Sequence, residues 1–183
     1  MILLGLGSNR SGIWGRPADM IIRCVKELTD LTFFSVQKKS SLYQTASVGP
    51  GRSSVFVNAV VAGDSHLSPE ALLRALKYLE RGAGSRSAMP WGPRALDIDV
   101  LAYKDRVIGW PASRKNSRQM RKSGPPLTIP HPGLHVRPFV LVPLLEICPD
   151  WRHPVLKLSV RQFCHRASSV TQGKVLQRIE INS

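Results

Sequence analysis

The amino-acid sequence predicts an α+β fold in which helices flank a mainly antiparallel sheet. Its segments follow the order strand, helix, strand, strand, helix, strand, which is the order of a split βαβ sandwich. Both helical segments carry apolar residues at helical spacing, and the strand segments show alternation or short apolar runs. In this topology we expect the first and fourth strands near the centre of the sheet, with their functional residues in one cleft.

The first half of the chain supplies three of the predicted strands and one helix. Residues 1–7 alternate weakly and lead into a polar turn at 7–9. Residues 17–31 are expected to form an amphipathic helix, because the apolar positions share one face and a proline suits the first turn. Residues 33–43 are extended in character, and 56–62 are a clear strand candidate.

The second half begins with another amphipathic helix. Ser68 is a typical N-cap before a first-turn proline, and we expect the helix to end at the glycines 82 and 84. The fourth strand lies within the segment 91–103, WGPRALDIDVLAY. After it come a basic stretch rich in proline and serine at 109–126 and a final apolar segment at 139–147.

Composition indicates a single domain, residues 1–183, with a basic loop insertion at about 109–126. The formal charge of +14 suggests anionic partners, such as nucleic acid, a membrane surface or phosphorylated small molecules. The densest basic cluster, at 113–122, contains no aromatic residue, which disfavours nucleic acid. Three separated cysteines and no apolar run of membrane-spanning length predict a cytoplasmic protein without a disulfide framework or a zinc site. We expect it to be a monomer.

Two carboxylates, Asp97 and Asp99, lie two residues apart in the predicted fourth strand. Successive side chains of a strand point to opposite faces, so the two carboxylates share one face and the apolar residues around them share the other. Paired like charges become favourable around a divalent cation, and carboxylate oxygens suit Mg2+. Arg94, just upstream, can hold a phosphate with two hydrogen bonds. The pattern predicts metal-assisted phosphate chemistry; a solvated strand face is the alternative.

The chain also resembles a known family, the 6-hydroxymethyl-7,8-dihydropterin pyrophosphokinases, from residue 2 to about 153. Five segments occur in the family's order: GLGSN, SLYQTASVGP, FVNAVV, WGPRALDIDVL and LTIPHPGLHVRPFVLVPLLEICP. The resemblance implies a ferredoxin-like α+β fold and an ATP-dependent diphosphotransferase of folate biosynthesis. Such an enzyme moves diphosphate from ATP to the hydroxymethyl group of the dihydropterin and releases AMP, with ATP as co-substrate and two Mg2+ ions.

The same resemblance assigns roles to individual residues. Asp97 and Asp99 would bind the two Mg2+ ions, and together with Arg94 and Arg86 they would form the catalytic group. The residues expected to bind the pterin are Thr45, Phe56, Asn58, Trp91 and Phe139. The residues expected to contact ATP are Leu73, Arg94, Ile98, Thr128, His131 and Arg137.

Several of these residues have simpler interpretations. Phe56 and Phe139 can pack in the core, as large apolar side chains usually do. His131 can be a structural histidine beside its neighbouring prolines, and Leu73 can lie on a helix surface or in the core.

The chain departs from the family where a lid over the ATP phosphates is expected. Residues 84–87 retain one arginine, Arg86, and a proline precedes Trp91 where the family often has another arginine. We hypothesise that the basic cluster at 114–122 folds over the triphosphate and replaces part of the missing charge; a passive solvated loop is the alternative. For the whole chain, the alternatives are a degenerate homologue that binds pterin or ATP with poor turnover, and a basic nucleic-acid-binding module.

Overall fold

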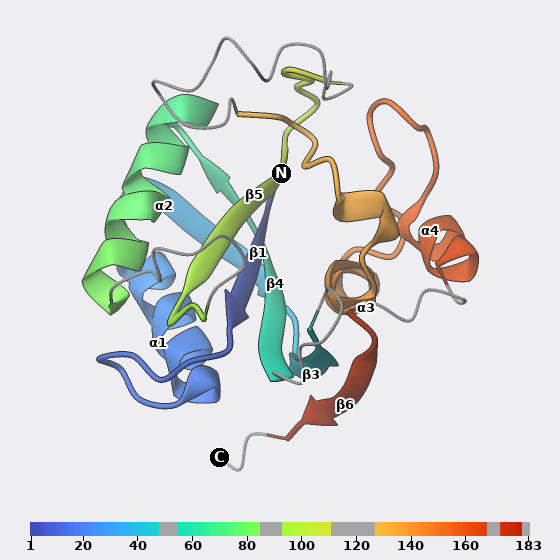
Figure 1. Ribbon diagram of the computed structural model, residues 1–183. Coiled ribbons are helices and arrows are strands. Elements are labelled where there is room, and N and C mark those ends of the chain that lie inside the picture. The colour runs from blue at the N-terminus through green and yellow to red at the C-terminus, as the bar shows by residue number, and fades with distance from the viewer. Residues whose placement is uncertain (48–54, 85–92, 111–126, 168–172, 181–183) are drawn as a thin grey trace, which may run out of the picture.

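One sheet separates two layers of helices (Figure 1). The computed structural model describes residues 1–47, 55–84, 93–110, 127–167 and 173–180. Within these ranges the strands are β1 (Ile2–Ser8), β2 (Phe34–Lys39), β3 (Leu42–Ala46), β4 (Val55–Ser65), β5 (Asp97–Tyr103) and β6 (Val175–Ile179). The helices are α1 (Pro17–Asp30), α2 (Pro69–Ala83), the short 3-10 helix η2 (Leu134–Val136), α3 (Pro138–Ile147) and α4 (Val160–Arg166). Helices α1 and α2 lie on one side of the sheet, and α3 and α4 lie on the other (Figure 1).

Every pairing between the described strands is antiparallel, in the order β5-β1-β4-β3-β6 with β2 beside β4. The predicted α+β fold, with a mainly antiparallel sheet and flanking helices, is confirmed. The expected central position is correct for β1, which lies between β4 and β5, but wrong for the fourth predicted strand. That strand, β5, pairs only with β1 among the described strands, because side chains of α2 occupy its other edge.

The extended segment predicted at 33–43 forms two strands that meet at Ser40. The Ser40 N–H donates to Val60 O at 2.9 Å, and Ser40 Oγ accepts from the Val60 N–H at 2.9 Å. A side chain therefore replaces a backbone acceptor at this point, and the ladder is interrupted. On either side of the break, β2 and β3 pair with different parts of β4.

Both predicted helices are confirmed close to their expected bounds. Ser68 caps α2, since its Oγ accepts from the Ala71 N–H at 3.2 Å. The helix ends at Gly84, whose φ of 138° favours glycine. The buried faces of α1 and α2 pack on Leu4, Leu6 and other residues of the sheet to form the larger core.

The other side of the sheet is covered only in part. The apolar segment predicted at 139–147 forms α3, which is apolar on nearly every side because it lies between the sheet and α4. Helix α4 and strand β6 were not predicted from the sequence. The uncovered part of this face holds the cleft described below. Among the described residues, none of the helices combines the length and apolar character needed to cross a membrane.

Two side chains of α2 seal the outer edge of β5 at Ile98. Glu80 accepts from the Ile98 N–H at 2.6 Å, and Lys77 donates to Ile98 O at 3.0 Å. The two side chains also form an ion pair of 2.5 Å, with the Glu80 side chain 1% exposed. Burial raises the pKa of Glu80, and the charge of Lys77 opposes that effect. The pair supplies the acceptor and the donor that a neighbouring strand would supply.

The sealed edge predicts a difference between two substitutions of Glu80. Glu80→Leu should destabilise the fold by about 3 kcal/mol, because it leaves the buried Ile98 N–H without an acceptor and removes the nearer of the two carboxylates beside Lys77. Glu80→Gln keeps an acceptor of the same shape and should cost clearly less. Urea unfolding followed by circular dichroism measures both losses, and equal losses would contradict the role given to the carboxylate.

Candidate active site

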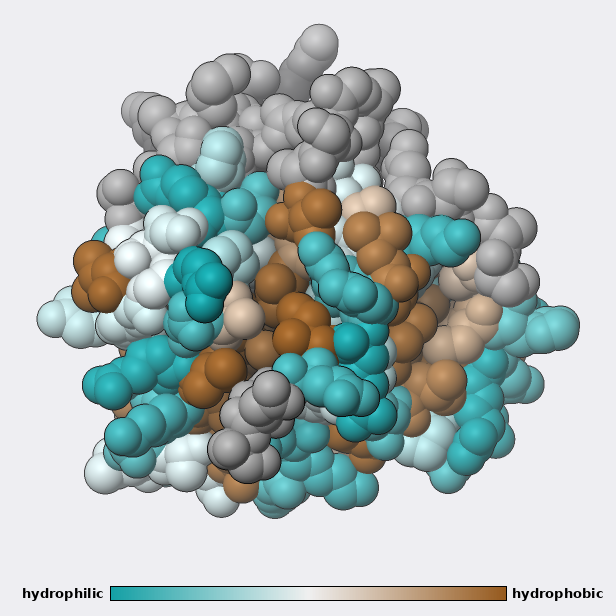
Figure 2. Space-filling model, turned by 90° about the horizontal axis from the view of Figure 1, so that it is seen from below, coloured by the Kyte–Doolittle hydropathy of each residue, from teal (hydrophilic) through white to brown (hydrophobic). Residues whose placement is uncertain are grey.

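A cleft of about 490 Å³ opens on the part of the sheet that α3 leaves uncovered. Strands β1, β4 and β5 contribute to it, as do β3, the loop before α3 and the first turn of α3. The predicted site residues that line it are Thr45, Phe56, Asn58, Arg94, Asp97, Asp99, His131, Arg137 and Phe139. Seen from below, apolar residues gather in the middle of the molecular surface between hydrophilic flanks (Figure 2).

Strand register places a glycine between the two halves of the cleft. Gly7 of β1 pairs with Asn58 of β4 on one side and with Asp97 of β5 on the other. Gly5 likewise pairs with Asp99. A Cβ atom at Gly7 would lie 3.1 Å from Asn58 Oδ1, which is tighter than an ordinary contact. Because Gly7 has no side chain, nothing on β1 rises between the Asn58 amide and the carboxylates of Asp97 and Asp99.

The two carboxylates have different surroundings. Asp97 forms an ion pair of 2.5 Å with Arg94, and Lys77 Nζ lies 3.9 Å from Asp97 Oδ1. The Asp99 carboxylate forms no hydrogen bond or ion pair with any described residue. The described residues contain no group of three or more metal-ligating side chains. Two carboxylates with room for further ligands suit a Mg2+ ion that keeps waters and shares phosphate oxygens.

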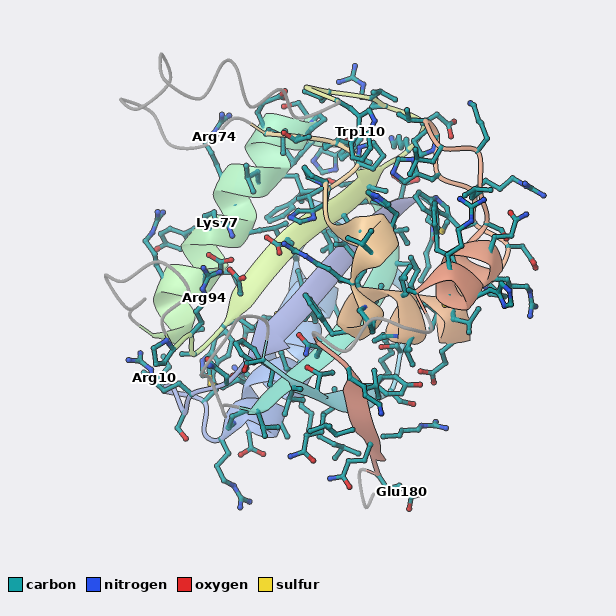
Figure 3. All side chains as sticks on the ribbon, turned by 45° about the vertical axis from the view of Figure 1, so that its right-hand side comes forward. Arg10, Arg74, Lys77, Arg94, Trp110 and Glu180 are labelled. Carbon is teal, nitrogen blue, oxygen red and sulfur yellow. The ribbon has the colours of Figure 1, made fainter. Side chains whose placement is uncertain are left out.

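The turn after β1 fixes the backbone at Arg94. Asn9 Oδ1 accepts from the Arg94 N–H at 2.7 Å, and the Asn9 N–H donates to Arg94 O at 3.1 Å. Ser8 Oγ donates to Ala95 O at 2.6 Å. In Figure 3 the Arg94 side chain lies between those of Arg10 and Lys77, along the α2 side of β5. The predicted proximity of the 7–9 turn to the paired aspartates is confirmed.

The loop before α3 contributes a neutral donor and a cation. The Gly133 N–H donates to His131 Nδ1 at 3.0 Å, so the neutral ring carries its proton on Nε2. Burial lowers the pKa of His131, while the nearby Asp99 carboxylate raises it. The Arg137 guanidinium lies 5.7 Å from the centroid of the Phe139 ring, within the range of a cation–π contact. The Nε2–H of His131 and the guanidinium of Arg137 are both suitable donors to phosphate oxygens.

The opposite side of the cleft combines a fixed amide with an aromatic ring. Asn58 Nδ2 donates to Thr45 Oγ1 at 2.7 Å, and both residues are buried. This bond orients the amide and leaves Asn58 Oδ1 and a second N–H for a ligand. With Phe56 and Phe139 lining the same cleft, the arrangement suits a flat ring with a polar edge.

Other predicted contacts lie elsewhere. Ile98 is buried in the larger core and Leu73 packs against that core, so neither lines the cleft. Thr128 lies beside Ile129, which pairs with Ile108, and it too is absent from the lining. Outside the described residues lie Arg86, Trp91 and the basic cluster at 114–122.

The sequence reasoning missed Gly5 and Lys77. It placed Gly7 in the turn near the aspartates without indicating that this glycine lies between Asn58 and those carboxylates. Gly5 and Gly7 gave a signal, because glycines at alternate positions of a strand leave one of its faces bare. The sequence signal for Lys77 is weak: it lies three residues before Glu80, a spacing that allows an ion pair on a helix.

A carboxylate pair bordered by arginines and aromatic rings, on an α+β sheet, is the arrangement expected of an enzyme that transfers phosphate groups. The chain belongs to the 7,8-dihydro-6-hydroxymethylpterin-pyrophosphokinase (HPPK) family, which it matches over residues 3–149.

Curated relatives cover most of the chain. It is 33% identical to the 2-amino-4-hydroxy-6-hydroxymethyldihydropteridine pyrophosphokinase of Aquifex aeolicus over 162 residues, which make up 88% of this chain and 89% of the relative. It is 37% identical to the protein of the same name from Synechocystis over 179 residues, 98% of this chain and 82% of the relative.

Solved structures support the fold. The wild-type HPPK-DHPS of Plasmodium falciparum superposes with a TM-score of 0.67 at 16% identity. The similarity covers 90% of this chain but only 40% of that longer chain. At this identity the comparison concerns the fold alone, and it agrees with the ferredoxin-like expectation.

The lack of a side chain at Gly7 predicts opposite effects for two alanine substitutions. Gly7→Ala should displace the Asn58 side chain, weaken its bond to Thr45 and cost about 1–3 kcal/mol of unfolding free energy. Gly82→Ala is the control, because nothing lies within 4 Å of a Cβ at that helical position, and it should stabilise by about 0.5–1 kcal/mol. Urea unfolding and the Asn58 side-chain amide signals in NMR spectra report both effects. Unchanged Asn58 signals in Gly7→Ala would argue against the contact.

Proposed function

We propose that this protein transfers diphosphate from ATP to the hydroxymethyl group of 6-hydroxymethyl-7,8-dihydropterin and releases AMP. The observation that carries the proposal is the row Asn58–Gly7–Asp97 across three adjacent strands. It joins a pocket suited to a flat polar ring to a carboxylate pair suited to metal-bound phosphates. Family membership and the names of the curated relatives support the same reaction.

Pterin binding would depend on Asn58 and the two phenylalanines. Stacking of a bicyclic ring between Phe56 and Phe139 contributes about 0.5–1.5 kcal/mol beyond the area buried. The Asn58 amide, oriented by Thr45, would pair with the polar edge of the ring. With the ring held there, its hydroxymethyl group would reach across Gly7 toward the aspartates.

Asp97 and Asp99 are the residues that would hold Mg2+, and we propose two ions as the family resemblance implies. Bound Mg2+ would neutralise charge on the phosphate oxygens and align them for in-line displacement. Arg94 keeps guanidinium N–H groups beyond its bond to Asp97 and would grip the same phosphates. His131 would donate from Nε2, and Arg137 would add a second fixed cation. The chain's own contribution is positioning and electrostatic stabilisation rather than covalent chemistry.

The remaining parts of the proposal follow the sequence. Arg86 would belong to the lid and Trp91 to the pterin pocket. The 114–122 cluster would supply cations over the triphosphate, and Leu73, Ile98 and Thr128 would lie near the nucleotide. We further propose a single-domain monomer in the cytoplasm, with ATP and the dihydropterin as its small-molecule partners.

The test is Mg2+-dependent AMP formation from ATP on addition of the hydroxymethyl dihydropterin. We expect AMP only when both substrates and Mg2+ are present. Binding of both substrates without AMP would support the degenerate homologue instead. Filter binding to DNA and RNA across a salt series is the companion measurement, since tight and steeply salt-dependent binding would favour the nucleic-acid-binding alternative.

The metal role predicts that Asp97→Asn and Asp99→Asn each lower turnover by about 100-fold or more, because a neutral amide is a poor Mg2+ ligand and removes charge stabilisation. Pterin affinity, measured by titration, should change much less. Asp105→Asn is the matched control, an exposed aspartate just beyond the same strand. Rates within a few-fold of the parent at saturating Mg2+ in either cleft variant would rule out the assigned role.

A further inference from the structure

A cluster of aromatic rings joins four parts of the chain: Trp110, the 3-10 helix η2, the segment 151–153 and helix α4. His153 contacts Trp110 and Trp151, with ring centroids 5.1 and 6.0 Å away. Its centroid also lies 6.1 Å from that of His135 and 5.9 Å from that of Phe163. In Figure 3 Trp110 lies among the crowded side chains beyond the start of α3, well separated from Arg94. His153, Trp151 and Phe163 follow the span 3–149 that matches the family.

Hydrogen bonds fix the tautomer of His153. Its Nδ1 accepts from the backbone N–H groups of Val155 and Leu156, at 3.2 and 3.1 Å. A nitrogen that accepts hydrogen bonds carries no proton, so the neutral ring carries its proton on Nε2. Burial, reinforced by His135, lowers the pKa of His153 to about 4, which keeps the ring neutral near pH 7.

The Nε2–H of His153 is a buried donor without an acceptor among the described residues. Nδ1 of His135 is a buried atom that also has no partner in the part of the chain that the structure describes. We take His135 as the Nε2–H tautomer, in which Nδ1 is an acceptor; a buried donor and a buried acceptor in neighbouring rings are each costly unless they are joined. A metal ion does not suit this pair, because His153 Nε2 already carries the ring proton. Neither nitrogen has a hydrogen-bond partner among the described residues, so they do not bond to each other directly, and one water between the two rings would satisfy both.

His135 lies in the loop that carries two proposed phosphate ligands. It is the middle residue of η2, between His131 and Arg137. The loop is tightly folded on itself, because a Cβ at Gly133 would lie 2.3 Å from Arg137 Nε. It is attached to the rest of the protein by the bond from the His131 N–H to Leu101 O at 2.8 Å, by the buried Leu134, and by contacts of the His135 ring with Trp110 and Phe163. A constraint on His135 therefore acts on both phosphate ligands.

We propose that His153 is a positioning residue for ATP binding: through one buried water it fixes His135 and with it the loop 131–137. The water accepts from His153 Nε2–H and donates to His135 Nδ1. The effect on ATP rests on the proposed function, whereas the hydrogen-bonded bridge does not. The segment that follows the family-matched span thus takes part in shaping the phosphate side of the cleft.

His153→Asn is the informative variant, because the Asn oxygen can replace Nδ1 as acceptor for Val155 and Leu156 while the bridge is lost. We expect the dissociation constant for a non-hydrolysable ATP analogue, and the KM for ATP, to rise about fivefold to thirtyfold. The KM for the pterin should rise less than that for ATP, since Asn58 and Phe56 lie on β4 and Phe139 is held by the first turn of α3. His66→Asn, at an exposed histidine, should change neither constant.

A double-mutant cycle separates the bridge from general loosening of the fold. His135→Leu should weaken ATP binding to a similar degree, and the double variant with His153→Asn should be no weaker than either single variant, because all three lack the same link. Multiplying losses would overturn the proposal, as would unchanged ATP affinity in folded His153→Asn.

NMR spectroscopy of histidine nitrogens in the parent protein tests the bridge without any variant. We expect His153 as the Nε2–H tautomer with a proton protected from exchange, and His135 with an unprotonated Nδ1. The opposite tautomer at His153 would overturn the proposal. Absence of AMP formation by the parent would instead overturn the proposed function and leave this spectroscopic result interpretable.

Discussion

The register of β1 between β4 and β5 is the constraint on which the cleft depends. Because β1 pairs with both neighbours, Gly7 has Asn58 on one side and Asp97 on the other. A shift of β1 by one residue would turn its leucines, Leu4 and Leu6, out of the core that α1 and α2 fill and onto the cleft face. The buried alternate residues Leu4 and Leu6 oppose such a shift, so packing on one face fixes the chemistry on the other.

Helix α3 covers its face of the sheet only in part, so the side chains that line the cleft stay accessible. Helix α3 packs on Leu3, Val60 and Leu101 and forms a smaller core there. Where β1 continues as Gly5 and Gly7, no side chain rises to meet a helix, and the space remains open. The start of α3 borders this space with Phe139, so the helix that closes one half of the face also supplies a wall for the other.

Features that depend only on residues close together in the sequence were predicted correctly. The Ser68 cap and the 3.6-residue spacing defined α2, and the alternation around Asp97 put both carboxylates on one face. The break at Ser40 escaped prediction because it depends on Val60, twenty residues away. The edge position of β5 was not predicted for the same reason. It depends on Lys77 and Glu80 of α2, which bond to the β5 backbone at Ile98. The residues proposed for a lid over the phosphates lie outside the described residues, so that part of the site stays a prediction.

The alternating charges beside β5 explain why the two aspartates are not equivalent. Glu80 is buried against Lys77, whose ammonium group lies 3.9 Å from Asp97, and Arg94 pairs with Asp97 on the other side. Asp97 is thus already neutralised by the protein's own cations. Asp99 has no such partner among the described residues and influences His131 through its charge alone. A cation entering the cleft gains most from Asp99, while its approach to Asp97 competes with Arg94 and would release that guanidinium toward a phosphate.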